Sequence, residues 1–244
     1  MVCYQEIKTD MVSDPIIKAH KLYRIYVMDT ADVIGITDIN LDIAAGETVV
    51  LKGESGSGKS TLLSLLAALD QPTGGELNIA GYNMKTSTDQ RLTRFRREVV
   101  GMVFQNFNLL PTFNVSENVM LPGLLAGKGN LSVKKKADKL LQWLGLSKRA
   151  THFPAQLSGG EMQRTAIARA LINDPMIILA DEPTGNLDSR NSQIVIELFQ
   201  EITVDGKRTL IVATHSTIAD HIATMSLYLK DGRLINEDNT KDGI

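Results

Sequence analysis

The sequence predicts an α/β fold: a three-layer core around a parallel sheet, with an N-terminal antiparallel β layer and an inserted α-helical subdomain. Residues 16–25 and 35–43 alternate between apolar and polar side chains, which is typical of antiparallel strands with one buried face. Residues 106–157 have largely helical spacing. From residue 176 onward, apolar strands alternate with a helix, and this order favours a parallel sheet.

The remaining elements follow from the same periodicities. A short apolar strand at 47–52 runs into a glycine-rich loop and then a helix at 59–69, and strands are expected at 76–80 and 99–104. The elements expected beyond residue 105 are helices at 116–126, 132–145 and 160–172, a strand at 176–180, a helix at 188–202, and strands at 209–213, 225–230 and 233–236.

Length and composition set the domain organisation. The chain has 244 residues, of which 43% are hydrophobic, and this is enough for one large domain with a small attached subdomain. We expect a single domain in which 1–105 and 158–244 form the core with the antiparallel layer, and 106–157 form the helical insert. Residues 1–14 and 237–244 are expected to be flexible ends.

The sequence also indicates a soluble cytoplasmic protein. No apolar run approaches the roughly 18 residues that cross a bilayer. Residues 1–14 lack the basic, apolar and small-residue order of a secretory signal. The single cysteine, Cys3, cannot form an internal disulfide, and no cysteine or histidine cluster has metal-ligand spacing, which fits a reducing compartment.

Charge argues against nucleic acid as a partner. The formal net charge is −2, whereas proteins that bind nucleic-acid phosphates over an extended surface usually have a strongly basic face. Basic residues gather locally at 91–97 and 134–136. We interpret both runs as solvated helix faces, with contact to anionic lipid headgroups as the alternative.

The glycine-rich loop matches the phosphate-binding pattern G-x-x-x-x-G-K-[ST] in full. Its apolar strand before and helix after are the context that this pattern needs, and they indicate a P-loop NTPase (RecA-like) core. Lys59 supplies charge, the hydroxyl of Ser60 can ligate Mg²⁺, and Thr61 can reach the α-phosphate of ATP. The expected ATP-binding residues here are Gly53, Glu54, Ser55, Gly56, Ser57, Gly58, Lys59, Ser60 and Thr61.

Two carboxylates follow the apolar strand at 176–180. Ligands of open α/β sheets bind at the carboxyl ends of the strands, so Asp181 and Glu182 should face the phosphate loop. We expect Asp181 to hold Mg²⁺ through water and Glu182 to polarise the attacking water. The alternative is an ordinary helix cap.

A second anion-binding element is expected at residues 157–164, LSGGEMQR. Ser158 and Glu161 have the spacing of a capping box, and Gly159 and Gly160 leave the first amides of the helix open to an anion. Because the chain already has a phosphate loop, this helix end should face the ATP of a second copy. We therefore expect Ser158, Gly159, Gly160 and Glu161 to act in trans.

These motifs, with FQNFNLLP at 104–111 and LADEPTGNLD at 179–188, resemble the ATP-binding cassette (ABC) ATPases. The sequences of these motifs are similar to those of the branch that contains lipoprotein-releasing, macrolide-exporting and antimicrobial-peptide-resistance ATPases. The resemblance implies an active ATPase that uses ATP and Mg²⁺ and forms a head-to-tail homodimer. It also implies transmembrane permease subunits, a possible periplasmic adaptor, and a peripheral position on the cytoplasmic face of the inner membrane.

The resemblance assigns further residues. It implies that Tyr26 stacks on adenine, with Tyr23 as the alternative. Gln105 would bind Mg²⁺ or the water and would hinge the helical insert. His215 would contact the γ-phosphate and Glu182. The catalytic residues implied are thus Glu182, His215, Lys59 and Gln105. Asp188 would cross the subunit boundary, although it could instead only cap the next helix.

The groove for a membrane partner is implied just beyond Gln105, at Phe107, Leu109, Leu110 and Phe113; the alternative for each is a hydrophobic core under a loop. The sequence does not identify the transported substrate. The alternative function is a regulatory cassette of the cell-division type, which switches a membrane complex without transport. A DNA-repair or translation cassette is disfavoured, because its coiled-coil insertions, zinc modules or second cassette do not fit into this length.

Overall fold

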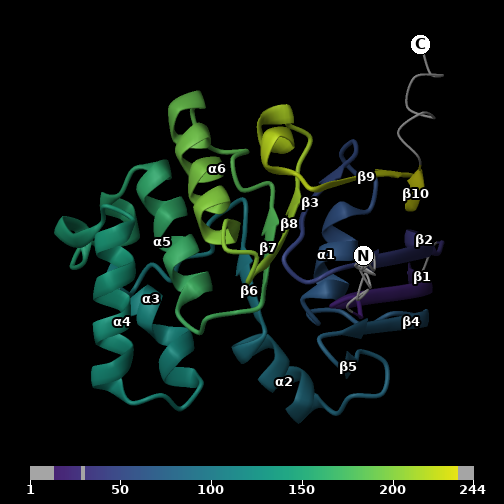
Figure 1. Cartoon of the computed structure of the whole chain (residues 1–244), viewed down its shortest axis with the longest axis horizontal. Helices are drawn as coiled ribbons and strands as arrows, with labels where there is room; N and C mark the ends of the chain where they lie inside the picture. Colours follow the sequence, from purple (N-terminus) through teal and green to yellow (C-terminus); the bar gives the residue numbers. More distant parts are fainter. Residues whose placement is uncertain (1–13, 29–30, 236–244) are drawn as a thin grey trace, which may run out of the picture.

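The structure is a computed structural model that describes residues 14–28 and 31–235. Cys3 and the two ends expected to be flexible lie outside the described residues, apart from Asp14. Within this part of the chain, the helices and strands form two sheets and a group of helices on one side (Figure 1).

The antiparallel sheet has the strand order β2-β1-β4-β5. Its strands are β1 (Ile17–Tyr26), β2 (Val33–Ile43), β4 (Gly74–Ile79) and β5 (Tyr82–Asn83). In β2, Ile39, Leu41 and Ile43 are buried while the residues between them are exposed, as the alternation predicts. The first two predicted strands are confirmed within two residues, whereas the two-residue β5 is too short to have a periodicity.

The second sheet has the order β10-β9-β3-β8-β7-β6, with parallel pairing except between β9 and β10. Its strands are β3 (Thr48–Lys52), β6 (Val100–Val103), β7 (Ile177–Asp181), β8 (Thr209–Ala213), β9 (Met225–Lys230) and β10 (Arg233–Ile235). The predicted parallel sheet is confirmed. Because β3 pairs with β8 and β9, the sheet joins the N-terminal third of the chain to the C-terminal third.

The helices largely follow the predicted ranges. They are α1 (Lys59–Leu66), α2 (Asp89–Glu98), α3 (Val115–Leu125), α4 (Asn130–Trp143), α5 (Gly159–Leu171) and α6 (Ser189–Thr203), with short 3-10 helices at Ser147–Arg149, Pro154–Gln156 and Thr217–Ile222. The helix predicted at 59–69 ends early, because the next residue after its cap, Ala68, has a φ of 52°. Helices α3 and α4 lie within the segment 106–157.

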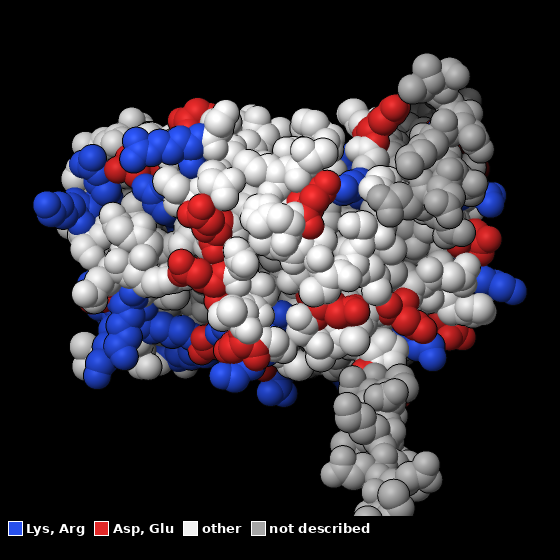
Figure 2. Space-filling view, turned by 45° about the horizontal axis from the view of Figure 1, so that its top comes forward, with Lys and Arg blue, Asp and Glu red and all other residues white. Residues whose placement is uncertain are grey.

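Helix α2 contains the basic run at 91–97. Leu92 and Phe95 are buried while the four arginines of the run are exposed, so the run is one face of an amphipathic helix. These arginines are Arg91, Arg94, Arg96 and Arg97. In α4, Lys134 pairs with Asp138 and Lys136 with Asp174. Figure 2 shows Lys and Arg gathered at the side of the molecule where Figure 1 shows α3 to α5. Both runs are solvated helix faces, as predicted.

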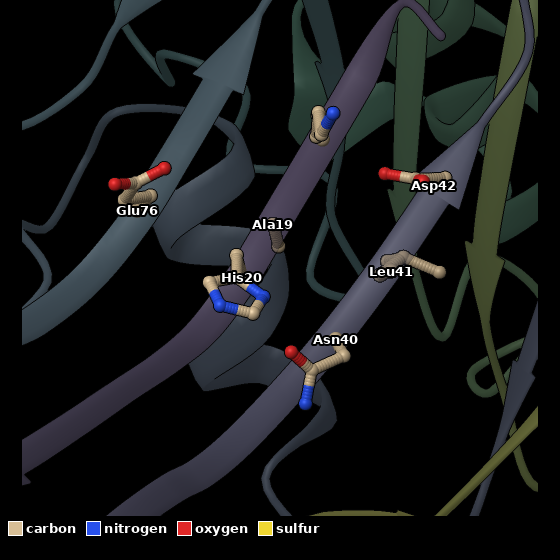
Figure 3. Close-up of a pocket in the computed structure, with 7 residues that line it drawn as sticks. Ala19, His20, Asn40, Leu41, Asp42 and Glu76 are labelled. Atoms are coloured by element: carbon tan, nitrogen blue, oxygen red, sulfur yellow. The ribbon is translucent and has the colours of Figure 1, made fainter.

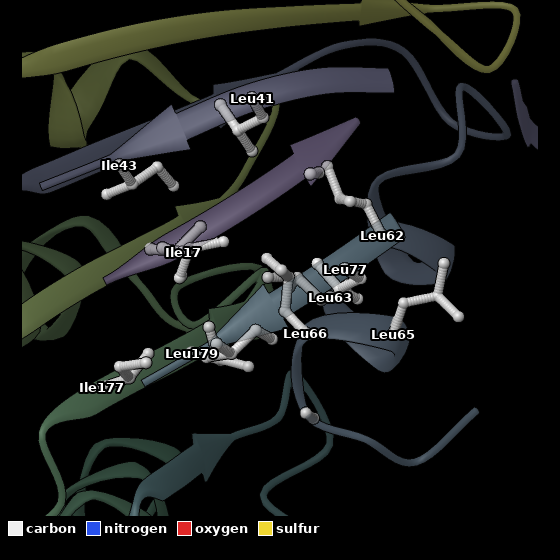
Figure 4. Packing of buried hydrophobic residues seen from close by; sticks show 14 of the residues in the cluster. Ile17, Leu41, Ile43, Leu62, Leu63, Leu65, Leu66, Leu77, Ile177 and Leu179 are labelled. Atoms are coloured by element: carbon white, nitrogen blue, oxygen red, sulfur yellow. The ribbon is translucent and has the colours of Figure 1, made fainter. Parts of the chain in front are cut away.

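The parallel sheet separates two hydrophobic cores. Successive residues of β7 point to opposite faces: Ile177 and Leu179 pack with α1 and the antiparallel sheet, and Ile178 and Ala180 pack with α3 to α6. Figure 4 shows the leucines of α1 between the antiparallel strands and β7. Helix α1 therefore has apolar neighbours on both sides, which fixes its first turn, and with it the phosphate loop, against the sheet.

Gly101 tests the packing of β6 on α5. A Cβ at this position would lie 2.5 Å from the carbonyl oxygen of Ala170, which is backbone and cannot rotate away. Gly101→Ala should therefore lower the free energy of unfolding by about 1–3 kcal/mol. Gly129→Ala is the steric control: the added Cβ meets open space and φ is −61°, so it reports only the cost of alanine at the N-cap of α4. Urea denaturation of both variants measures the difference; equal effects of the two substitutions would contradict the close packing.

Candidate nucleotide site

The phosphate loop connects β3 to α1, and its backbone requires glycine at two positions. Gly53 has a φ of 152° and Gly58 a φ of 106°. A Cβ on Gly53 would lie 2.2 Å from the carbonyl oxygen of Leu229, and one on Gly58 would lie 2.5 Å from that of Gly35. Glycine is therefore needed at both positions, because the backbone has a positive φ and neighbouring backbone leaves no room for a side chain.

Lys59 lies at the centre of this loop. Its side chain is only 7% exposed, and its Nζ donates to the carbonyl oxygens of Gly53 (2.7 Å) and Glu54 (2.9 Å). The same Nζ lies 3.9 Å from Oε1 of Glu182. The loop therefore wraps around a buried positive charge, which is the arrangement that attracts an anion.

Asp181 ends β7 beside the loop. Its Oδ1 is buried without a hydrogen-bond partner. Burial raises the pKa of its carboxyl, against the lowering effects of a hydrogen bond with Ser60 and the charge of Lys59. An unpartnered carboxylate oxygen next to a hydroxyl fits a Mg²⁺ site, since Mg²⁺ takes few protein ligands and completes its shell with water and phosphate. No group of three or more Cys, His, Asp or Glu among the described residues could hold a metal by itself.

Glu182 follows directly and is held on both carboxylate oxygens. Thr214 Oγ1 donates to Oε2 at 3.1 Å, and His215 Nδ1 lies 2.9 Å from Oε1. Glu182 has a φ of 44°, and its amide donates to the carbonyl of Ala213. A left-handed backbone at a non-glycine residue is strained, and here the amide hydrogen bond to Ala213 of β8 holds it. The structure thus joins Lys59, Asp181, Glu182 and His215 in one place.

The two tyrosines considered for adenine lie differently. A Cβ on Gly35 would lie 2.8 Å from Tyr26 Cε2 and 2.9 Å from Thr61 Cγ2, so the Tyr26 ring lies beside the end of the phosphate loop. Its hydroxyl donates to Asp70, and Arg24 stacks 4.5 Å from the ring centroid. Tyr23 instead packs onto Gly74 of β4. Of the two tyrosines, Tyr26 is therefore the one whose ring lies next to the end of the phosphate loop.

Gln105 lies next to the loop that follows Glu182. Asn186 Nδ2 donates to the carbonyl of Gln105 at 3.1 Å and to Oδ1 of Asn106 at 3.0 Å. A Cβ on Gly185 would lie 2.8 Å from Nε2 of Gln105. The ends of β6 and β7 are thus linked, and the start of the helical region is attached to the acidic strand end.

The segment after Gln105 is held by two side chains that sequence reasoning missed. Arg169 of α5 donates to the carbonyls of Phe107 and Asn108, and burial lowers the pKa of its guanidinium. Asn118 of α3 accepts from the amide of Leu110 and donates to the carbonyls of Leu110 and Phe113. Arg169 interrupts an apolar run in its helix, which is the one signal that could have drawn attention to it.

The four residues expected to form a partner groove are not in the buried core. Leu110 is exposed, and Phe107, Leu109 and Phe113 are half-buried.

The helix end at residue 158 is built as a capping box. The hydroxyl of Ser158 accepts from the amide of Glu161, and Oε2 of Glu161 accepts from the amide of Ser158 at 2.9 Å. The bond from the Ser158 amide and the ion pair with Arg149 lower the pKa of Glu161 to about 2. A Cβ on Gly160 would lie 2.1 Å from Oδ1 of Asn191, so this glycine permits α5 to approach α6.

Asp188 begins α6 as its N-cap. Its Oδ1 accepts from the amide of Asn191 at 2.8 Å and its Oδ2 accepts from the side-chain amide of the same residue. The capping alternative is therefore confirmed for the single chain. No hydrogen bond or ion pair among the described residues joins Asp188 or the segment 158–161 to the phosphate loop. The structure thus divides the predicted residues into two separate groups.

A pocket away from the phosphate loop lies on the antiparallel sheet (Figure 3). It is lined by His20, Asn40, Asp42 and Glu76 among others, on β1, β2 and β4. These exposed side chains form no cluster that could hold a metal.

In the described part of the chain, no helix has the length and apolar character needed to cross a membrane.

Comparison with known proteins identifies relatives across most of the chain. A family model described as "ABC transporter" matches residues 36–185. The lipoprotein-releasing system ATP-binding protein LolD of Treponema pallidum is 42% identical over 92% of this chain and 99% of its own length. The macrolide export ATP-binding/permease protein MacB of Rhodopirellula baltica is 45% identical over 91% of this chain, which spans only 33% of that longer protein.

Solved structures agree. The dimeric post-hydrolysis state of the cassette MJ0796, bound to ADP and Pi, has a TM-score of 0.84 and 38% identity, covering 90% of this chain and 97% of that one. The cbiO1 protein of Clostridium perfringens, part of a cbiONQ transporter complex, has a TM-score of 0.80 and 26% identity, covering 92% of this chain and 88% of that one. The predicted fold class is thereby confirmed.

The capping carboxylate of α5 predicts a pH dependence of stability. Because folding lowers the pKa of Glu161 from 4.5 to about 2, its ionised form stabilises the folded state above pH 4.5, and this contribution is lost as the pH falls toward 2. The difference in unfolding free energy between the wild type and Glu161→Gln should therefore shrink over that window. Arg149→Met should reduce the same pH dependence. Denaturation curves at several pH values measure both, and a constant difference would contradict the assignment.

Proposed function

The chain belongs to the ABC transporter family, and from this premise we propose how it works: it is the ATP-hydrolysing subunit of a membrane complex whose membrane-spanning subunits are separate chains. The observation that carries the proposal is the convergence of Lys59, Asp181, Glu182 and His215 at the ends of β3, β7 and β8. ATP is the substrate of this site, as it is for the family.

The phosphate loop binds the triphosphate in this proposal. The amides from Gly53 to Thr61 and the ammonium of Lys59 neutralise the β- and γ-phosphates, so Lys59 exchanges the loop carbonyls for phosphate oxygens. Tyr26 offers its ring face to adenine, supported by its place beside Thr61. The residues that would hold Mg²⁺ are Ser60, Gln105 and, through water, Asp181. When bound, Mg²⁺ supplies charge neutralisation of the phosphate oxygens.

Glu182 is the proposed general base. Its carboxylate accepts a proton from the attacking water, whose oxygen bonds to the γ-phosphorus while the bond to the ADP oxygen breaks. His215 is exposed enough to reach the γ-phosphate and adjoins the same carboxylate, at 2.9 Å. Gln105 adjoins Gly185 and can orient the water from the other side.

A second copy of this chain completes the site. Within the described residues, no hydrogen bond or ion pair joins Ser158, Gly159, Gly160, Glu161 or Asp188 to the phosphate loop of their own chain. The N-terminus of α5, at Ser158, Gly159 and Gly160, nevertheless attracts an anion. We propose a head-to-tail homodimer in which this end closes on the partner's ATP. The dimeric state of the MJ0796 cassette supports this arrangement. Loss of the γ-phosphate weakens the attraction, and the two subunits separate.

The segment 106–113 is the proposed contact with the membrane subunits. Leu110 is 41% exposed, and the segment is attached both to Gln105 and, through Arg169, to the helix that begins at Ser158. The chain would then lie on the cytoplasmic face of the membrane and drive export, lipoprotein release or force transmission, with a periplasmic adaptor in some assemblies. A regulatory cassette of the cell-division type is the second candidate, and identification of a co-purified membrane subunit separates the two. Nucleic acid is not a proposed partner.

Glu182→Gln tests the general base. The substitution keeps the shape of the side chain but cannot accept the proton, so ATP should bind and the dimer should persist because hydrolysis no longer separates it. Size-exclusion chromatography with ATP and Mg²⁺ should show a long-lived dimer, while the wild type shows a transient one. A monomer with unchanged turnover would refute the role of Glu182.

Ser158→Arg tests the action in trans. A bulky cation at the helix end blocks closure on the partner's ATP, and loss of preorganised anion donors typically costs about 10²–10³-fold in rate. Turnover should fall by that order, while nucleotide affinity of the monomer stays unchanged. Ser158→Asn, which keeps an N-cap, controls for the loss of helix capping. Parallel loss of affinity and turnover would place the residue in its own chain's site.

A further inference from the structure

Thr214 stands out because its buried side chain contacts the carboxylate on which hydrolysis depends. The residue follows β8 directly, is 1% exposed, and lies before His215. We propose that Thr214 is a positioning residue for ATP hydrolysis: its hydroxyl fixes the orientation of the Glu182 carboxylate. This inference rests on the proposed function, since it concerns the residue that acts as general base there.

The direction of the hydrogen bonds follows from the neighbours of Thr214 Oγ1. The amide of Ser216 donates to this oxygen at 3.0 Å. A hydroxyl that accepts from an amide keeps its own hydrogen for another acceptor, and Glu182 Oε2 lies 3.1 Å away. An ionised carboxylate can only accept, so Thr214 is the donor. The hydroxyl hydrogen of Thr214 therefore points to Glu182. Without the contact from the Ser216 amide, the hydroxyl could rotate to other acceptors.

The backbone of Thr214 fixes where this donor lies. Its amide donates to the carbonyl of Leu51 at 3.0 Å, one residue before the end of β3 and close to the start of the phosphate loop. Its β-branched side chain has few rotamers. The hydroxyl is thus placed relative to the phosphate loop by the parallel sheet, and through it the position of the carboxylate is tied to the position of the bound phosphates.

Thr214 differs from its neighbour in this respect. His215 contacts the other carboxylate oxygen, but its side chain is 69% exposed and is free to turn toward nucleotide. Lys59 lies 3.9 Å from the carboxylate and is expected to bind phosphate. When both groups engage ATP, Thr214 is the contact that continues to hold Glu182. A misplaced base loses rate without loss of substrate affinity.

The test compares Thr214→Val with Thr214→Ser in steady-state ATPase assays of the full chain. Valine keeps the shape and removes the donor, and loss of a hydrogen bond to a charged group should lower kcat about tenfold to a hundredfold. KM and nucleotide affinity should stay within about threefold, because the residue does not touch ATP. Thr214→Ser keeps the hydroxyl and should recover most of the rate. An unchanged kcat in Thr214→Val, or no recovery in Thr214→Ser, would overturn the proposal.

Thr209→Val is the matched control on the same strand. Thr209 is also 1% exposed, and its hydroxyl accepts from the amide of Gly46 at the opposite end of β8. The Thr209→Val variant should be less stable, because the amide of Gly46 loses its acceptor, but its kcat should be unchanged. A similar fall of kcat in Thr209→Val would mean that any buried hydroxyl in β8 matters, and would overturn the proposal. If Thr214→Val does not fold, Thr214→Ala serves in its place, with thermal unfolding recorded for each.

The double variant Thr214→Val/Glu182→Gln separates failure of this inference from failure of the proposed function. If Thr214 acts through Glu182, the valine substitution should add less than about twofold to the loss in Glu182→Gln alone. Full multiplication of the two losses would overturn the inference while leaving the base assignment in place. Wild-type turnover in Glu182→Gln alone would instead overturn the proposed function.

Discussion

Parallel pairing of β3, β8 and β7 is the constraint on which the site depends. Leu51 pairs with Ala213, and Ala213 pairs with Asp181, so the three strands end at the same level. Each strand then continues into a different functional segment: the phosphate loop, the histidine and threonine, and the acidic pair. Residues more than a hundred positions apart in the sequence become neighbours because in-register parallel strands release their carboxyl ends at one edge.

That edge concentrates charge that only a ligand can satisfy fully. Lys59 is buried among carbonyl oxygens, and Asp181 has a carboxylate oxygen with no partner. Buried charges are costly unless they are paired, so the folded protein carries an unfavourable arrangement that phosphate and a cation would relieve. Two hydrophobic cores, one on each face of the sheet, hold this arrangement in place. Stability elsewhere in the fold thus maintains a site prepared for a highly charged substrate.

Side chains that hydrogen-bond to backbone connect the acidic strand end, the segment 106–113 and the helices α3 and α5. Asn186 holds the end of β6, Arg169 holds Phe107 and Asn108, and Asn118 holds Leu110. These donors join the loop after Glu182 and the helices α5 and α3 to one segment. The segment 106–113 is therefore joined to α5 and α3 by directional hydrogen bonds, and not by apolar contacts alone.

The sequence by itself determined the strands other than β5, the phosphate loop, the acidic strand end and the capping box at Ser158, because each is a local pattern whose spacing has a direct physical meaning. It left Tyr23 and Tyr26 as alternatives for adenine, and left Asp188 between two roles. The structure shows Tyr23 packed on Gly74, Tyr26 beside Thr61, and Asp188 as the N-cap of α6. The contacts of Thr214, Arg169 and Asn118 are decided only by the tertiary structure. Their partners are distant in the sequence or are backbone groups, and a hydrogen bond to a carbonyl leaves no mark in the residue type of the acceptor.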